Sequence, residues 1–320
     1  MTLEQLNKRI QTTTDLRNIV STMKMLSSVS VVQYARAETG LMQYTETLID
    51  GFKALAVNKG LPVQQQKLHT NHLQNTLILL VGSDNGLVGL FNKSILIQVD
   101  KFLKSEQLER DKTPCICLGR RLCAMAQYEK LHVIHSFPTT HNLNEIAGSA
   151  SQLIHLIQET IMRNHIKRVI VFSNERKREG SHVRMQQLIP FAIPVISKNQ
   201  KQIWEGRSFP LLSISEEDFL KALIHEYIVT ILSQTIISSL ACEHYVRMIH
   251  MQQSEKNIDK SLEEMNLIYA QERQTNITNE LIDIVSGANS VKKKKKRHIS
   301  TLTNTKKNDK NKHHKKGVNL

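Results

Sequence analysis

Residues 82–89, Gly-Ser-Asp-Asn-Gly-Leu-Val-Gly, have the composition of a loop that could bind phosphate. They follow a short apolar run, and backbone N–H groups at a strand-to-helix turn are where such anions are held. However, the loop matches neither G-x-x-x-x-G-K-[ST] nor G-x-G-x-x-G, the two patterns that cradle nucleotide phosphates. We therefore predict a tight strand-to-helix loop here, with no nucleotide.

Cysteine and histidine side chains could bind a metal or act as nucleophiles. Cys115, Cys117 and Cys123 lie close in sequence, but no second cluster completes a zinc set, and Cys242 stands alone. We predict four buried, reduced thiols that behave as small apolar side chains. The fourteen histidines show no H-E-x-x-H pattern, and no Ser-His-Asp or Cys-His arrangement can be identified. The sequence thus predicts no catalytic residue, no metal site and no cofactor.

Basic residues are concentrated at the C-terminal end of the chain. Residues 292–320 contain twelve Lys or Arg and one Asp, a balance of +11 within the total of +14, so the other residues carry only +3. Because residues 291–320 are poor in apolar side chains, we predict a disordered lysine-rich tail. Contact with nucleic acid, attraction to anionic lipid and a simple solvated appendage are the three interpretations of this composition.

Two long helices are predicted at the two ends of the chain. Residues 1–60 have apolar side chains at steps of three and four, and Thr2 and Gln5 have the spacing of a capping box. Residues 215–290 begin with the capping signature Ser215-Glu216-Glu217-Asp218 and contain no proline, and Gly287 has the position of a C-terminal cap. At 1.5 Å per residue these helices are about 85 Å and 105 Å long, too long for the inside of a compact domain.

The segment between them, residues 75–205, changes its hydrophobic period. Short apolar runs at 76–81, 114–118, 131–134 and 168–172 predict buried strands, and helical patterns at 92–104, 120–130 and 142–164 alternate with them. Residues 182–196 predict an added edge strand or hairpin. This alternation is typical of an α/β domain with a parallel sheet. The predicted fold is an antiparallel coiled coil of the terminal helices with an inserted Rossmann-like α/β domain.

The C-terminal helix is predicted to extend beyond its partner by about 15 residues, or roughly 20 Å. That end carries apolar side chains, which need cover from another chain: Ile277, Leu281, Ile282, Ile284 and Val285. No run of 18 or more apolar residues is present, so we expect no transmembrane span. The first residues resemble neither a secretory signal nor an organelle presequence, so we expect a soluble protein on the cytosolic side.

The C-terminal helix resembles that of the γ subunit of bacterial F-type ATP synthases. The resemblance extends over residues 3–290, and Ser83-Asp84-x-Gly86-Leu87 is similar to the family's central loop, although Asn85 and Val88 replace its usual basic residue and cysteine. The matching positions are Arg9-Ile10, Met23-Lys24-Met25, Ala241-x-Glu243, Arg247-Met248-x-x-Met251, Asn257, Leu267-Ile268-Tyr269, Arg273-Gln274, Ile277-Thr278-x-Glu280-Leu281 and Ile284-Val285-Ser286-Gly287-Ala288.

This resemblance implies a central rotor stalk without catalytic residues of its own. Its expected partners are the α and β subunits (α₃β₃), the ε subunit and the ring of c subunits, at the cytoplasmic side of a cell inner membrane. The resemblance also assigns roles to side chains on the long helices. Coupling or interface contacts are expected from Lys24, Arg247, Gln274, Thr278 and Glu280, and an apolar bearing from Ile277, Leu281, Ile284 and Val285.

Two other classes of function remain open on the sequence. A coiled-coil adaptor with a nucleic-acid-binding tail predicts a homodimer and salt-sensitive binding that residues 292–320 carry. A nucleotide-dependent enzyme predicts ATP binding by the α/β segment alone. The coupling ion, H⁺ or Na⁺, depends on the c ring, and the direction of the reaction depends on the whole complex.

Overall fold

The computed structural model describes residues 2–59, 75–177, 180–191 and 211–314. The end of the predicted 182–196 strand, part of the 75–205 segment and the last six residues of the tail lie outside the described residues. The chain divides into two compact units. The larger unit is Ile19–Glu255, and the smaller unit joins Met1–Asn18 to Lys256–Leu320.

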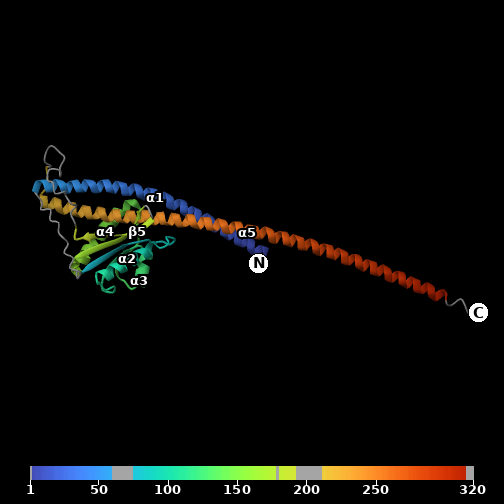
Figure 1. Ribbon diagram of the computed structural model, residues 1–320. Coiled ribbons are helices and arrows are strands. Elements are labelled where there is room, and N and C mark those ends of the chain that lie inside the picture. Colours follow the sequence, from blue (N-terminus) through green and yellow to red (C-terminus); the bar gives the residue numbers. More distant parts are fainter. Residues whose placement is uncertain (1, 60–74, 178–179, 192–210, 315–320) are drawn as a thin grey trace, which may run out of the picture. The chain divides into compact units, whose positions relative to one another are not determined.

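A five-stranded sheet forms the centre of the larger unit (Figure 1). Its strands are β1 (Thr76–Val81), β2 (Pro114–Leu118), β3 (His132–Phe137), β4 (Arg168–Lys177) and β5 (Gly180–Ile189). Their order is β3-β2-β1-β4-β5, with β1 to β4 parallel and β5 antiparallel to β4 at the edge. All six side chains of β1 are buried, as expected for the central strand of a parallel sheet. The predicted α/β fold class with an added edge strand is confirmed.

Helices cover the two faces of the sheet in different ways. On one face, α2 (Phe91–Ser105) and α3 (Arg120–Tyr128) pack on Ile78, Leu80 and Phe172. On the other face, α4 (Leu143–Asn164) packs beside the long helix α5 (Glu216–His314). Successive strand residues alternate between the two faces, and both faces are apolar. The long helix therefore forms part of the core of the α/β domain.

The two long helices pair in antiparallel fashion within the larger unit. Near one end of this section Phe52 of α1 (Leu3–Lys59) meets Tyr227 edge-on, with ring centroids 5.7 Å apart, and Leu48 and Leu55 bury against Leu223. Further along, Tyr34 stacks on His244 at 5.4 Å. Residue numbers rise along α1 as they fall along α5, which is the antiparallel arrangement predicted for the coiled coil.

The smaller unit contains the start of α1 and the stretch of α5 that contacts it. The Thr2 hydroxyl accepts from the Gln5 N–H and the Gln5 side chain accepts from the Thr2 N–H, so the predicted capping box is formed. Arg17 of α1 forms an ion pair with Asp259 of α5 within this unit. Because α1 begins at Leu3, the part of α5 beyond about residue 275 has no partner helix in the described part of the chain.

Helix α5 differs from the sequence prediction at its C-terminal end. We expected a cap at Gly287 and a disordered tail from 291 to 320, whereas the helix continues to His314. Neither glycine nor proline occurs between Gly287 and Gly317. Extending an existing helix by one residue fixes only that residue, and lysine is a good helix former, so a single glycine does not end the helix.

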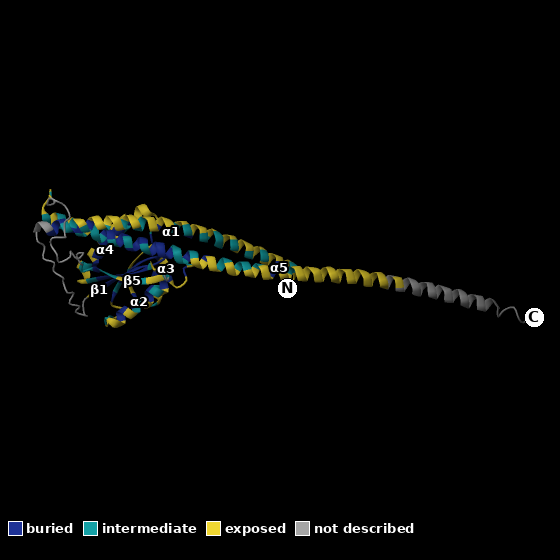
Figure 2. Cartoon of the chain, turned by 45° about the horizontal axis from the view of Figure 1, so that its top comes forward, coloured by how far each residue is buried: buried dark blue, intermediate teal, exposed yellow. Residues whose placement is uncertain are grey.

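One 18-residue window of α5, within Glu216–Asn289, has the length and hydropathy of a membrane span among the described residues. More than half of that window, 56%, is buried inside the fold. Figure 2 shows the buried section of α5 where it crosses the sheet. A core helix that is covered on several sides has this same composition, so the window is explained by packing.

Candidate functional site

The loop from Gly82 to Gly89 joins β1 to α2, as predicted, and Ser83 in this loop forms hydrogen bonds with Asn92 of the same domain. The Ser83 N–H donates to Asn92 Oδ1 at 3.0 Å, and Asn92 Nδ2 donates to the Ser83 hydroxyl at 2.9 Å. Both side chains are buried. The first turn of α2 is therefore tied to the end of β1 by a pair of side-chain hydrogen bonds.

Asp84 follows in the same loop, and its carboxylate organises the neighbouring loops. Its Oδ1 accepts from the N–H of Arg120 at 2.8 Å and from the N–H of Thr139 at 3.1 Å, while its side chain is only 4% exposed. The Arg120 guanidinium and the His141 ring lie 3.8 and 3.9 Å from Oδ2. Because Arg120 opens α3, the carboxylate also lies at the positive end of a helix.

Helix α5 contributes a second buried acid to the same region. Glu243 is 1% exposed and forms an ion pair with Arg247, one turn further along, which is 6% exposed. Burial raises the pKa of Glu243 to about 7, with Arg247 acting in the opposite direction and the Asp84 charge adding to the rise. Burial, followed by the charges of Arg247 and His141, lowers the pKa of His244 to about 4.

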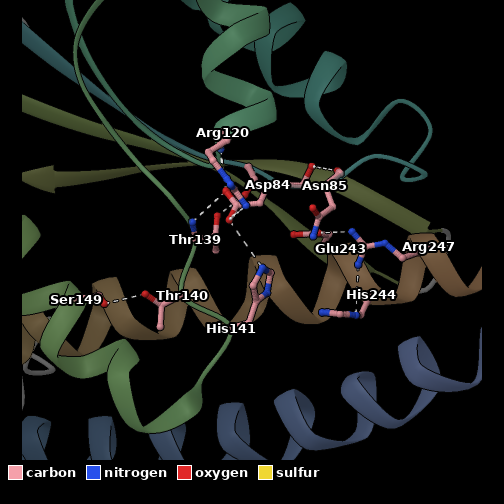
Figure 3. A network of polar contacts seen from close by, with 12 residues as sticks. Asp84, Asn85, Arg120, Thr139, Thr140, His141, Ser149, Glu243, His244 and Arg247 are labelled. Carbon is pink, nitrogen blue, oxygen red and sulfur yellow. Dashed lines mark hydrogen bonds and ion pairs between the residues drawn. The ribbon is translucent and has the colours of Figure 1, made fainter. Parts of the chain in front are cut away.

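We call these groups the junction cluster: Asp84, His141, Glu243, His244 and Arg247, which Figure 3 shows, together with Tyr34. The Tyr34 hydroxyl donates to the His141 carbonyl at 2.8 Å, and the rings of His141 and His244 meet edge-on at 6.3 Å. The cluster thus connects α1, the β1–α2 loop, the segment before α4 and α5. Its arrangement serves to hold the α/β domain on the paired helices.

Gly89 allows a close approach of the loop to the same helix. Its φ is +55°, and a Cβ at this position would lie 2.2 Å from Nε2 of His250 on α5. Both the backbone conformation and the missing side chain favour glycine here. The loop therefore contacts α5 at the junction cluster and again at His250.

The predicted interface residues are placed in two different environments. Lys24 forms an ion pair with Glu255 across the helix pair, and Arg247 forms a buried ion pair with Glu243. Both side chains therefore have a charged partner within the same chain. By contrast, Gln274, Thr278 and Glu280 are exposed on α5 in the smaller unit. The Thr278 hydroxyl donates to the Gln274 carbonyl at 2.9 Å, one turn back.

The predicted bearing residues are also exposed in that unit. Exposed fractions are 48% for Ile277, 58% for Leu281, 68% for Ile284 and 58% for Val285. At 100° per residue the first three lie within about 60° of each other around the helix. We call the four residues Ile277, Leu281, Ile284 and Val285 the terminal apolar face. Figure 2 shows that α5 is exposed along this stretch.

The α/β domain offers little for nucleotide or metal chemistry in the part that the structure describes. All four cysteines are buried and free, as predicted, and burial raises the pKa of Cys115 to about 12 and that of Cys242 to about 11. Among the described residues no group of three or more His, Cys, Asp or Glu could hold a metal ion. A cavity of about 170 Å³ between α4, α5 and the segment after β3 has no charged side chain in its lining.

Comparison with known proteins identifies the family. The family model described as ATP synthase matches residues 2–291, nearly the whole described chain. The chain belongs to the ATP synthase family. The match includes α1, the inserted domain and α5 as far as residue 291, and it ends where the lysine-rich segment begins.

Individual relatives agree with this family over their full length. The ATP synthase gamma chain of Aquifex aeolicus is 22% identical over 289 residues, which is 90% of this chain and 97% of the relative. The gamma chain of Fusobacterium nucleatum is 25% identical over 296 residues, with 90% and 99% covered.

A solved structure supports the fold. The rotor of the Euglena gracilis mitochondrial ATP synthase, at 14% identity, has a TM-score of 0.58 over 86% of this chain and 99% of that chain. At this identity the likeness shows the fold alone.

The sequence did not reveal the junction cluster as a set. Asp84, Glu243 and Arg247 were noted as matches to family motifs, but His141 and His244 were not singled out at all. One signal was present: Glu243 and Arg247, four residues apart, follow the apolar stretch 228–242 of the helix. A Glu-Arg pair at that spacing inside an apolar helix section indicates a buried ion pair.

Proposed function

We propose that this chain is the γ subunit, the central rotor stalk, of an F₁F₀ ATP synthase. The observation that carries the proposal is the end of α5, which continues past its partner helix and presents the terminal apolar face to its surroundings. An exposed apolar helix end of this length needs a surrounding protein surface. The family match over residues 2–291 supports a partner within an ATP synthase, and we propose that the α₃β₃ hexamer provides this surface.

In this role the paired helices lie in the bore of α₃β₃, and the α/β domain contacts the ε subunit and the ring of c subunits. Ion flow through the membrane sector turns the ring and the stalk together. The stalk presents a different side to each β subunit and so biases the three catalytic sites among conformations of different nucleotide affinity. ATP hydrolysis drives the reverse rotation. The chain itself is non-catalytic, because the catalytic sites are on β.

The exposed residues of the smaller unit are proposed to contact the hexamer. The terminal apolar face acts as the bearing, since dispersion contacts lack the directional minima of hydrogen bonds. Gln274, Thr278 and Glu280 flank this face and are proposed to make contacts that change with the state of β. Lys24 and Arg247 already have partners within the chain, so we propose that they act by keeping the stalk stiff.

As a subunit of this complex, the chain is associated with a membrane as a peripheral protein, through the F₀ sector. We propose the cytoplasmic side of a cell inner membrane as its location. The proposal requires no cofactor and no specific nucleic acid. The junction cluster supports a mechanical role, because its charged groups are buried in contacts between elements that must turn as one body.

Co-expression with the α and β subunits of the same genome tests the proposal. Size exclusion followed by an ATPase assay should give a 3:3:1 complex whose activity depends on this chain. A chain that stays apart from α and β and elutes as its own dimer would contradict the proposal and favour the coiled-coil adaptor. ATP binding by the chain alone would instead favour the nucleotide-dependent enzyme.

A further inference from the structure

The cavity beside α4 is not used in the proposed function, and it lies at one edge of the sheet. Its lining comes from β2, β3, α4, α5 and the segment that joins β3 to α4. Leu118 is the last residue of β2 and Phe137 is the last residue of β3, so the cavity lies at the carboxyl ends of two parallel strands. Ligands of open α/β sheets bind at this edge. The cavity therefore has the position of a ligand site.

The inner part of the cavity is apolar. It is lined by four buried side chains from β2, α4 and α5: Leu118, Ile146, Leu153 and Ile236, whose exposed fractions are 6%, 1%, 4% and 2%. The ring of Phe137, which is 41% exposed, adds an aromatic wall. A buried water molecule needs about two to four polar partners, and these side chains offer none. An apolar group is therefore favoured over water in this part of the cavity.

Two hydroxyl groups make one side of the cavity polar. Thr140 Oγ1 and Ser149 Oγ lie 3.0 Å apart, and Figure 3 shows the two side chains directed toward each other. Each hydroxyl has one O–H donor and two lone pairs, and the bond between them uses one donor and one lone pair. The pair therefore keeps one O–H donor and further acceptor positions for a ligand.

The size and charge of the cavity limit what it can hold. Its volume is about 170 Å³, and a cavity of about 150 Å³ lined by Leu, Ile and Phe can bind benzene. No charged side chain occurs among the lining residues that the structure describes. An ion buried without a partner charge costs far more free energy than a neutral group. Pro138 and Gln152 of the lining are exposed, so a ligand can enter from solvent on this side.

We propose that this cavity binds a small neutral molecule with one aromatic ring and one hydroxyl group, the chemistry of phenol. The ring lies in the apolar inner part, where the Phe137 ring meets it edge-on or offset, the arrangements that aromatic rings prefer. The hydroxyl group bonds to the Thr140–Ser149 pair. The inference goes beyond the proposed function and does not depend on it, because every lining residue belongs to this chain.

The segment that lines the cavity also carries two hydrogen bonds of the junction cluster. The Thr139 N–H donates to Asp84 at 3.1 Å, and the His141 carbonyl accepts from the Tyr34 hydroxyl at 2.8 Å. Thr140, which lines the cavity, lies between them in the chain. A bound ligand therefore holds this segment in place and strengthens the attachment of the α/β domain to the paired helices.

A titration of the full-length chain with 4-fluorophenol, followed by fluorine NMR, tests the site. Ser149→Leu fills the cavity from α4, whereas Ser151→Leu adds the same side chain at an exposed position of the same helix. We expect a dissociation constant on the order of 1 mM for the unaltered chain and for Ser151→Leu. Ser149→Leu should bind at least about tenfold more weakly, because the ring no longer fits. Equal binding by the two variants, or no binding by the unaltered chain, would overturn the proposal.

A further variant, Thr140→Val, tests the hydroxyl pair without filling the cavity, because valine and threonine have nearly the same shape. It should weaken the binding of 4-fluorophenol roughly fivefold, the effect of one lost hydrogen bond, and leave the binding of fluorobenzene unchanged. The anion 4-fluorobenzoate has the same ring and should bind more weakly than either, because its charge has no partner in the lining. Equal weakening of 4-fluorophenol and fluorobenzene, or tighter binding of 4-fluorobenzoate, would contradict the proposed chemistry.

Photolabelling of the full-length chain with 4-azidophenol locates the site. We expect label on peptides that contain residues 137–153 or Ile236, and excess phenol should remove it. Hydrogen exchange of residues 138–142 should slow when phenol is bound, and unchanged exchange would contradict the effect on this segment. Label found only outside these peptides would show adsorption to other apolar surfaces and would overturn the site. Failure of the chain to assemble with α and β would instead contradict the proposed function alone.

Discussion

Replacing Arg247 by Ala should loosen the attachment of the α/β domain to α5, most strongly at alkaline pH. The change leaves Glu243 buried without its cation in the junction cluster. Breaking a buried pair by removing one partner typically costs about 3–5 kcal/mol. The pKa of Glu243 is already raised to about 7, so the acid can take up a proton in the variant. We therefore expect a loss of local stability of about 3 kcal/mol at pH 8, the lower end of that range.

The pH dependence follows from the direction of that pKa shift. The folded pKa of Glu243 lies above the ordinary value of 4.5, so its contribution to stability is present below 4.5 and is lost as pH rises through about 7. Removing Arg247 raises this pKa further, because Arg247 lowers it in the native chain. The pair therefore contributes mainly when Glu243 is ionised, and the effect of the substitution should be smaller at pH 6 than at pH 8 by about 1.3 kcal/mol.

Hydrogen exchange on the assembled complex measures this local stability. The relevant peptides cover residues 82–89 and 239–250, compared at pH 6 and pH 8 after correction for the intrinsic exchange rates. Arg163→Ala is the matched control, since Arg163 pairs with Glu159 at the same four-residue spacing but on an exposed surface. It should change local stability by less than about 0.5 kcal/mol. An equal loss in the two variants, or a loss at Arg247 that does not depend on pH, would refute the reasoning.

The same variant tests the functional meaning of the junction cluster. A stalk whose α/β domain is loosely held should transmit less torque from the hexamer to the membrane ring. Arg247→Ala should therefore reduce ion pumping more than ATP hydrolysis. Both activities are measured on one membrane preparation. An equal loss of the two would count against a coupling role for Arg247.

Three further predictions concern separate parts of the chain. Replacing Ile277 and Leu281 by Glu should leave the chain folded, because both are exposed, but should lower chain-dependent ATPase activity several-fold; unchanged activity would exclude them from the bearing. Gly89→Ala should lower the stability of the chain by more than about 1 kcal/mol, because of the positive φ and the clash with His250, and should lower the yield of assembled complex. Adding His250→Ala should restore part of that yield. Cys242, whose pKa burial raises to about 11, should resist iodoacetamide at pH 8 until the chain is unfolded in urea, as intact mass would show; rapid labelling of the native chain would contradict its burial.

Much of the fold could be predicted because local patterns and tertiary environment agree. The run 76–81 is apolar at every position and becomes the central strand β1, buried on both faces. Thr2 with Gln5 and Ser215 with Asp218 cap the two long helices as their spacing indicates. Beyond residue 290 the pattern is less decisive. Composition alone favoured disorder for residues 291–314, whereas the helix continues through them, as the propagation of an existing helix allows.

The site was harder to predict than the fold. Its residues come from α1, two loops and α5. Asp84 and Glu243 are separated by more than 150 positions, although the charge of Asp84 contributes to the raised pKa of Glu243. Periodicity reports which face of a helix is buried, but it does not report which polar groups meet there. The exposed end of α5 was predictable from length alone, because Leu3 limits how far α1 can accompany it.

Rotation is the central claim, and observing it in single complexes is the most direct test. Tyr128→Cys on α3 provides an attachment point, since Tyr128 is 89% exposed and the native cysteines are buried. A probe attached there, on complexes whose β subunits are fixed to a surface, should turn in one direction in three-fold steps when ATP is added. ATP hydrolysis by the same complexes with a stationary probe would contradict the account.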